Sequence, residues 1–307
     1  MASICYLVRV MLPALLTTLL WSVSAVCATR STRYLGGAVA NLARLCLATA
    51  LLALWAHTVG KGLGGAGLRF FVWSGFVGFG LGDIALYEAL PRLGSRLTLL
   101  LAQCLAAPVG ELVEWAWLGT TLTPVQIVAG FVILAGVAIG LASKHQIHLD
   151  RKHLASGTIF GVLAAIGQGG GAVLSRKAFL VTAQAGLVID GGTAAYQRII
   201  GGIGVAAMYL ALRRRVGGGK TTGGGLDWQK AWPWIVINTL SGPVIGVGCY
   251  QWALSTTPSG IVLPIVATLP LAVIPFSYRF EDDRPGWQSV AGGIIAVAGV
   301  VVLTLAR

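Results

Sequence analysis

Long apolar stretches separated by short polar connections recur along the whole chain. A stretch of about 20 apolar residues is long enough to cross a lipid bilayer as a helix. The apolar residues also run on continuously, as over 127–139, whereas the strands of a membrane barrel alternate apolar and polar positions. The pattern predicts ten spanning helices, at about residues 10–29, 38–57, 70–90, 97–117, 124–142, 155–177, 191–212, 232–254, 260–278 and 287–306.

Two motifs of this pattern occur in both halves of the chain. Gln126-Ile-Val-Ala-Gly130 opens the fifth predicted span, and Gln288-Ser-Val-Ala-Gly292 opens the tenth. Tyr87-Glu-Ala-Leu90 precedes the first of these, and Tyr250-Gln-Trp-Ala-Leu254 precedes the second. A weak internal repeat in a very apolar chain is typical of secondary transporters built from two related bundles.

The number of spans sets the relation between the halves. With five spans in each, the second copy enters the membrane in the opposite sense to the first. The expected fold class is therefore an all-α integral membrane protein with ten transmembrane helices in two five-helix inverted-topology repeats. We place the repeats at residues 1–142 and 155–307, with a linker at 143–154.

Composition agrees with a chain whose main partner is the lipid bilayer. Hydrophobic residues make up 56% of the chain, charged residues 10%, and the mean hydropathy is +0.82. A soluble domain carries roughly 25% charged residues. The net charge of +12 lies mostly in the connections, where basic residues contact anionic lipid, so nucleic acid is not an expected partner. More Lys and Arg residues fall on the side opposite the two termini, which by the positive-inside rule favours both termini outside.

The order of several motifs resembles a known family. In the first half the order is Gly82-Asp83, Tyr87-Glu-Ala-Leu90, Pro108, Gly119-Thr120, then Gln126 to Gly130. In the second it is Tyr250 to Leu254, Pro264, Pro270, the acidic turn 281–285, then Gln288 to Gly292. This order resembles the EamA-like family of the drug/metabolite transporter superfamily. The chain departs from it at Thr120, where the family usually has glutamate, and in the unusually acidic second turn.

The resemblance implies a multi-pass protein of the bacterial inner (plasma) membrane. It also implies both termini in the cytoplasm, contrary to the charge count. A related group of four-helix exporters in the superfamily uses a glutamate in the first helix to exchange protons for cationic drugs. The first span here has no carboxylate, so that mechanism is not carried over.

A polar side chain inside a span is costly in lipid and should face a cavity or a partner. Trp73, Asp83 and Tyr87 recur at helical spacing in the third span and are expected to share one face. Asp83 is a candidate proton or cation site; the alternative is a structural carboxylate held by an Arg or a serine hydroxyl. Aligning Tyr87 with Tyr250 puts Gly246 opposite Asp83, so the second half has no equivalent acid.

Other spans supply further candidates for a substrate pocket. Glu111 is a second possible ligand for an amine or a proton, and Gln168 occupies the position that matches Trp21 in the other half. The complete predicted binding set is Trp21, Ser24, Trp73, Asp83, Tyr87, Gln103, Glu111, Gln168, Tyr196, Asn238 and Tyr250.

Two arginines occupy matching positions early in the second and seventh spans, Arg44 and Arg198. Because the halves are inverted, we expect them toward opposite membrane faces. Each then lines a gate or meets an anionic group of the substrate; the alternative is snorkelling of the side chain to the nearest interface.

Cofactor and metal sites are not expected. The run Gly169-Gly-Gly171 lacks the Gly-Lys-Ser/Thr of a phosphate loop, and its glycines fit close helix contact instead. His145 and His148 could bind a metal, but their setting is that of an ordinary linker. An intramembrane enzyme would need a converging nucleophile and base, for which no motif is present.

The expected function is that of a secondary transporter, an exporter of a small polar metabolite such as an amino acid, working by alternating access between the repeats. Its partners are the small-molecule substrate, the bilayer and a coupling proton; monomer and homodimer both stay open. The alternatives are an exchanger of phosphate-bearing compounds or nucleotide sugars, and a membrane scaffold that does not transport.

Overall fold

The computed structural model describes residues 2–118, 123–141, 151–216, 226–257, 259–282 and 284–305, and nearly all of them are helical. The first half contains α1 (Ala2–Leu35), α2 (Gly37–Thr58), α3 (Leu68–Gly75), the π-helical segment η1 (Phe76–Gly82), α4 (Asp83–Cys104), α5 (Ala106–Leu118) and α6 (Pro124–Leu141). The second contains α7 (Arg151–Gln184), α8 (Gly191–Val216), α9 (Trp228–Thr239), the π-helical segment η3 (Leu240–Val244), α10 (Ile245–Thr256), α11 (Ser259–Val266), α12 (Leu269–Ala272), α13 (Ile274–Glu281) and α14 (Trp287–Leu305). The all-helical class predicted from the apolar pattern is confirmed.

Five helical stretches are long and apolar enough to cross a membrane, judged by length and composition over the described residues: Leu12–Leu35, Gly37–Thr58, Leu68–Trp117, Arg151–Gln184 and Gly191–Arg215. Pro124–Gly140 and Trp287–Val302 are shorter apolar helices. The predicted spans 232–254 and 260–278 correspond to helix that is broken into shorter pieces. The count of ten spans therefore stays a prediction, while a membrane protein with several apolar helices is established.

The breaks have local causes. Gly94 interrupts α4 with φ of +75°, a left-handed conformation that glycine adopts without steric cost. It divides the longest apolar stretch where the third and fourth predicted spans meet. The backbone N–H of Ser95 donates to Glu281 at 3.2 Å, which ties this break to α13. In α12 and α13, prolines at the first helical turns start new short helices.

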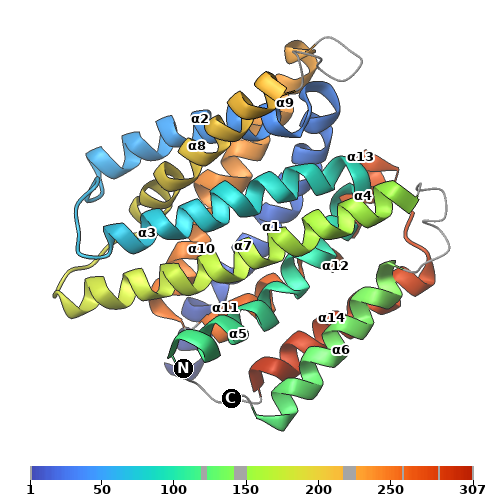
Figure 1. The fold of residues 1–307 in the computed structure, drawn as a ribbon. Coiled ribbons are helices and arrows are strands. Elements are labelled where there is room, and N and C mark those ends of the chain that lie inside the picture. The colour runs from blue at the N-terminus through green and yellow to red at the C-terminus, as the bar shows by residue number, and fades with distance from the viewer. Residues whose placement is uncertain are drawn as a thin grey trace.

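Helices from the two halves pack against each other in pairs (Figure 1). α6 lies against α14, α2 against α8, α4 against α7, and α1 against α9 and α10. The largest cluster of buried apolar side chains includes residues from both halves, such as Leu101 and Val266. The halves therefore share one core rather than forming two separate domains.

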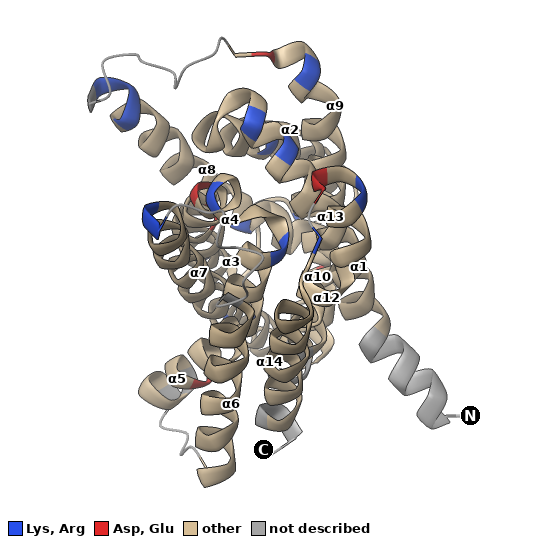
Figure 2. Ribbon diagram, turned by 90° about the vertical axis from the view of Figure 1, so that its right-hand side faces the viewer, with Lys and Arg blue, Asp and Glu red and all other residues tan. Residues whose placement is uncertain are grey.

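The outer surface is apolar. Phe131 on α6 is 68% exposed and Leu54 on α2 is 66% exposed. A continuous exposed apolar surface is stable only against an apolar partner, which for such helices is lipid. Many of the Lys and Arg residues gather in the upper part of the view in Figure 2, over α8, α9 and α13.

α7 begins at Arg151, four residues before the predicted start of the second repeat at residue 155. His145 and His148 lie outside the described residues.

Candidate substrate-binding site

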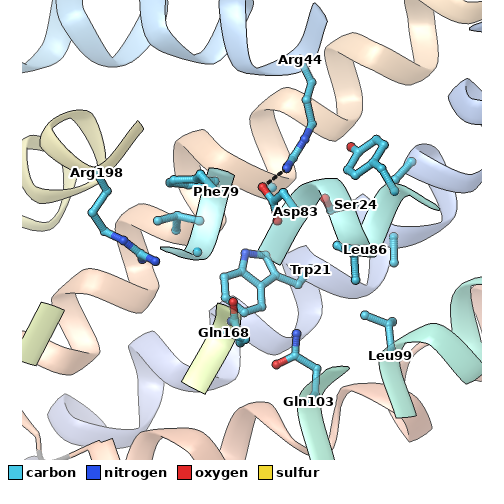
Figure 3. Close-up of a pocket in the computed structure, with 16 residues that line it drawn as sticks. Trp21, Ser24, Arg44, Phe79, Asp83, Leu86, Leu99, Gln103, Gln168 and Arg198 are labelled. Atoms are coloured by element: carbon cyan, nitrogen blue, oxygen red, sulfur yellow. Dashed lines mark hydrogen bonds and ion pairs between the residues drawn. The ribbon is translucent and has the colours of Figure 1, made fainter. Parts of the chain in front are cut away.

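A cavity lies between the halves, with room for water-sized molecules over about 70 Å³. Since one buried water needs roughly 10–15 Å³ on this measure, the cavity takes several waters or a small molecule. Its walls come from α1, α2, η1 with α4, α7, α8, and η3 with α10 (Figure 3). The lining residues are Trp21, Ser24, Ala25, Ala28, Arg44, Gly78, Phe79, Asp83, Leu86, Tyr87, Leu99, Gln103, Gln168, Arg198, Gly242 and Val247.

A glycine contact positions two of the polar side chains. A Cβ built on Gly167 would lie 2.4 Å from the Cα of Gly82, so only glycine allows this approach of α7 to η1. The next residues along the chain are Gln168 and Asp83, and both line the cavity. The contact of Gly167 thus brings an amide and a carboxylate to the same space. Close helix contact was expected for Gly169–Gly171, and a Cβ on Gly169 would lie 2.6 Å from the carbonyl oxygen of Ala106.

Arg44 and Asp83 form an ion pair at one side of the cavity (Figure 3). The Nε of Arg44 also donates to the side-chain oxygen of Asn41 at 3.1 Å, and its guanidinium lies 4.8 Å from the ring centre of Tyr87. The side chain of Arg44 is 6% exposed and that of Asp83 is 17% exposed. Asp83 is thus a carboxylate held by an arginine, one of the two situations weighed for it.

Arg198 reaches the cavity from another side, with its guanidinium 5.2 Å from the ring centre of Phe79 (Figure 3). The residue is only 3% exposed. Its Nε has no hydrogen-bond partner, and it forms no ion pair with any described residue. Snorkelling of Arg44 and Arg198 to an interface is excluded, because both side chains are buried at this cavity.

A layer of buried polar and aromatic residues supports the lining. The hydroxyl of Ser24 donates to Asn238 at 2.7 Å, and the amide of Asn238 donates to the hydroxyl of Tyr87 at 2.6 Å. Tyr250 packs on Trp21 with a ring-centre distance of 5.0 Å. Asn238 and Tyr250 therefore orient lining residues without lining the cavity themselves.

Most of the predicted site residues come together here. Eight of them line the cavity: Trp21, Ser24, Arg44, Asp83, Tyr87, Gln103, Gln168 and Arg198. Five do not: Asn238 and Tyr250 contact the lining residues from behind, while Trp73, Glu111 and Tyr196 lie elsewhere.

The prediction that Trp73 shares a face with Asp83 and Tyr87 is wrong. Trp73 is 58% exposed and packs on Phe76. The reason is η1: each π-helical turn takes about one residue more than an α-helical turn, so residues before it are rotated relative to those after it.

Glu111 and Tyr196 also lie elsewhere. Glu111 is buried in α5, which starts anew after a turn at Leu105, so the face of α4 that bears Gln103 does not continue into it. The hydroxyl of Tyr196 lies 3.2 Å from the Nε2 of His57, at the far end of α2.

Some residues of the site gave little or no signal in the sequence. Phe79 lies one turn before Asp83, and because its neighbours in the sequence are also apolar, nothing distinguishes it from residues that face lipid. Glu88 was noted in the sequence only as part of the motif Tyr87-Glu-Ala-Leu90 and not as a site residue. Its buried carboxylate binds Arg92 at 2.9 Å and Arg213 at 2.5 Å, and accepts from Tyr209 at 3.1 Å. No group of three His, Cys, Asp or Glu residues among those the structure describes could hold a metal ion.

Polar contacts join the two halves of the chain at both ends of α8. Toward its C-terminal end, Glu88 joins α4 to Arg213 and Tyr209. At its beginning, Asp190 accepts from the indole of Trp55 at 2.9 Å. Partial burial raises the pKa of Asp190, but hydrogen bonds from Thr193 and Trp55 outweigh it and hold the pKa below its usual value. At 1.5 Å per residue along α8, Arg198 lies about 12 Å from the Asp190 contact and about 22 Å from the Glu88–Arg213 contact.

Comparison with known proteins agrees with this architecture. No curated protein matches the chain. Among the solved structures that match, one described as "Crystal structure of protein" superposes with a TM-score of 0.63 at 18% identity, covering 97% of this chain and 96% of the other. At that identity it shows a common fold alone. The sequence model of the EamA-like transporter family matches residues 155–305. Through this match, the second half of the chain is assigned to the EamA-like transporter family, a family of membrane transporters that is in general not enzymatic.

Proposed function

We propose that the protein is a secondary transporter that carries a small polar metabolite, of the size of an amino acid, through the cavity between its halves. The observation that carries the proposal is a cavity between the two halves, with polar and charged side chains in its wall, in a chain whose second half matches a transporter family. Transporters of inverted-repeat folds bind substrate near the bilayer midplane at the interface between the repeats.

Two matching features support ten helices in two inverted repeats, at residues 1–142 and 155–307. When Tyr87 is aligned with Tyr250, the π-helical segments η1 and η3 fall at equivalent positions. The packing is matched as well: α1 contacts η3 and α10, and α7 contacts η1 and α4. A pseudo-two-fold relation between the halves accounts for both features.

Alternating access needs one closure on each side of the site. The contacts of Glu88 with Arg213 and of Asp190 with Trp55 lie on either side of Arg198 along α8, and both join elements of different halves. We assign these as the two closures, and we assign Arg44 and Arg198 to the cavity rather than to gates. Rocking of one repeat against the other would open one closure at a time.

Asp83 is the candidate site for a coupling proton. It is the acid that lines the cavity among the described residues, and it faces Arg44. Protonation of Asp83 would remove the ion pair and free Arg44, which links proton binding to a change in the site. An Asp83→Asn variant that keeps full, pH-independent transport would remove this role.

The setting we propose is the bacterial inner membrane, with transport outward as an exporter. The scaffold alternative predicts a filled centre, and the cavity between the halves, with Asp83, Arg44 and Arg198 in its wall, argues against it. An exchanger of nucleotide sugars would need several free basic groups, whereas one of the two arginines here is engaged by Asp83.

The test is a counterflow assay with the purified protein in liposomes. Vesicles loaded with unlabelled amino acids, organic acids, sugars, nucleosides or organic cations are diluted into the labelled compound, with and without a pH gradient. Accumulation of label in one class supports the proposal. A folded protein that moves none of these compounds would contradict it.

A further inference from the structure

We propose that the transported metabolite carries a small anionic group, in the first instance a carboxylate, and that Arg198 is the residue that binds it. The inference rests on the proposed function, because it names the class of substrate for the same cavity.

The charges that line the cavity do not balance. One carboxylate, Asp83, faces two guanidinium groups, those of Arg44 and Arg198. Arg44 takes Asp83 in an ion pair, while Arg198 pairs with no described carboxylate. A buried charge without a partner is strongly unfavourable in a protein interior. A site with one uncompensated positive charge is therefore built for a ligand with a negative one.

The polar atoms around the cavity that have no hydrogen-bond partner also favour an anionic ligand. The Nε of Arg198, the Nε2 of Gln168 and the hydroxyl of Tyr250 are buried and have no hydrogen-bond partner. Each of these groups can donate a hydrogen bond, so together they suit a ligand group that accepts several. Tyr250 also lies close enough to Arg198 for an electrostatic interaction. A carboxylate, with two oxygens and a planar shape that matches a guanidinium, meets these requirements.

The same contacts disfavour a positively charged group. An ammonium would need a free carboxylate, and Asp83 is engaged by Arg44. The cavity thus favours anions over zwitterions, and zwitterions over cations. Trp21, Phe79 and Leu99 offer an apolar wall for the rest of a compact molecule (Figure 3).

The experiment measures binding and transport with probes of defined charge. The wild type and three variants, Arg198→Gln, Arg198→Lys and Arg69→Gln, are purified in detergent and reconstituted. Arg69 is exposed at the start of α3 and serves as the matched loss of one arginine away from the cavity. The probes are lactate and benzoate as monocarboxylates, glycerol phosphate as a phosphate monoester, alanine as a zwitterion and tetramethylammonium as a cation.

We expect the monocarboxylates to raise the thermal unfolding temperature of the wild type and of Arg69→Gln, and to accumulate in counterflow. Arg198→Gln should lose accumulation at least tenfold, and the unfolding temperature of that variant should no longer respond to carboxylates. Arg198→Lys should keep part of the effect. An unfolding temperature of unliganded Arg198→Gln at or above that of the wild type shows that its loss of binding is not a loss of fold.

Several results would overturn the inference. Carboxylate binding by Arg198→Gln equal to the wild type would remove Arg198 from the site. Preference for tetramethylammonium or alanine would refute the anionic class while leaving transport itself in place. Preference for glycerol phosphate would keep the role of Arg198 but replace carboxylate by phosphate. If no probe moves and the wider counterflow screen is also silent, the proposed function fails together with the inference.

Discussion

Replacing Asp83 by asparagine is expected to destabilise the protein more than replacing Arg44 by glutamine, although each change breaks the same ion pair. In the wild type, one carboxylate offsets two buried guanidinium groups. Asp83→Asn leaves both arginines without a counter-charge, and the side chain of Arg44 is only 6% exposed. Breaking a buried pair in this way costs about 3–5 kcal/mol.

Arg44→Gln leaves one carboxylate, Asp83, and one guanidinium group, that of Arg198, so the charges that line the cavity then balance. The side chain of Asp83 is 17% exposed toward the cavity and keeps the nearby charge of Arg198. The expected cost is that of a lost charged hydrogen bond, about 1–3 kcal/mol. The double variant restores the wild-type net charge of the cavity, so its cost should be smaller than the sum of the two single costs.

The assay is thermal or chemical unfolding of the four proteins in the same detergent, analysed as a double-mutant cycle. Asp83→Asn should unfold several degrees below Arg44→Gln. Equal stability of the two single variants, or a more stable Asp83→Asn, would refute the charge count on which the reasoning depends.

Three further predictions test other parts of the structure. Gly136→Ala should cost about 1–3 kcal/mol in unfolding assays, because its Cβ would lie 2.4 Å from the backbone nitrogen of Ala296 on α14. Gly130→Ala, with nothing within 4 Å, should be neutral or stabilising, and equal losses would contradict the α6–α14 packing. Glu88→Gln should cost about 1–3 kcal/mol, less than Asp83→Asn, because Arg92 and Arg213 are 25% and 46% exposed and can be hydrated; a larger loss would argue against this. The pKa of Asp190 in the folded protein is below its unfolded value of about 3.8. The contribution of Asp190 to the free energy of unfolding is therefore present above pH 3.8 and is lost as the pH falls through the folded pKa. The unfolding temperature of the wild type should therefore drop more below pH 4 than that of Asp190→Asn, and identical pH profiles would remove this contribution.

The apolar pattern predicted where helices form because lipid imposes it on the sequence. Each outward face must be apolar over the length of a span, and this leaves polar residues such as Asp83 and Gln168 as visible exceptions. Cavity-facing residues could therefore be chosen from a single sequence. Arg44 and Arg198 stood out for the same reason, although the sequence left open whether they line gates, meet the substrate or reach the interface.

Helical spacing failed where the helix is not a regular α-helix. Trp73 and Glu111 were assigned to the cavity on the assumption of continuous α-helix, which η1 and the turn at Leu105 interrupt. The partner of Asp83 could not be chosen from the sequence, because the pair depends on how α2 lies against α4. Glu88 was missed since its partner Arg213 falls just outside the predicted span, at the end of α8.

Comparing the two repeats shows which positions of the site differ in their side chains. Trp21 of α1 packs against Gly246, and its counterpart Gln168 of α7 lies next to the glycine that packs against Gly82. The glycine scaffold is thus matched between the halves. Asp83 has no like residue in the second half, and Trp21 and Gln168 differ in chemistry. The cavity is asymmetric because its side chains, not its backbone, have diverged.

The most direct test of the central claim is to fill the cavity and measure transport. Leu99 is 3% exposed and lines the cavity, whereas Leu134 on α6 is 51% exposed on the outer surface. Counterflow of a compound that the wild type accumulates should be abolished in Leu99→Trp and unchanged in Leu134→Trp, with both variants folded. Wild-type accumulation by Leu99→Trp would show that the substrate does not pass through this cavity.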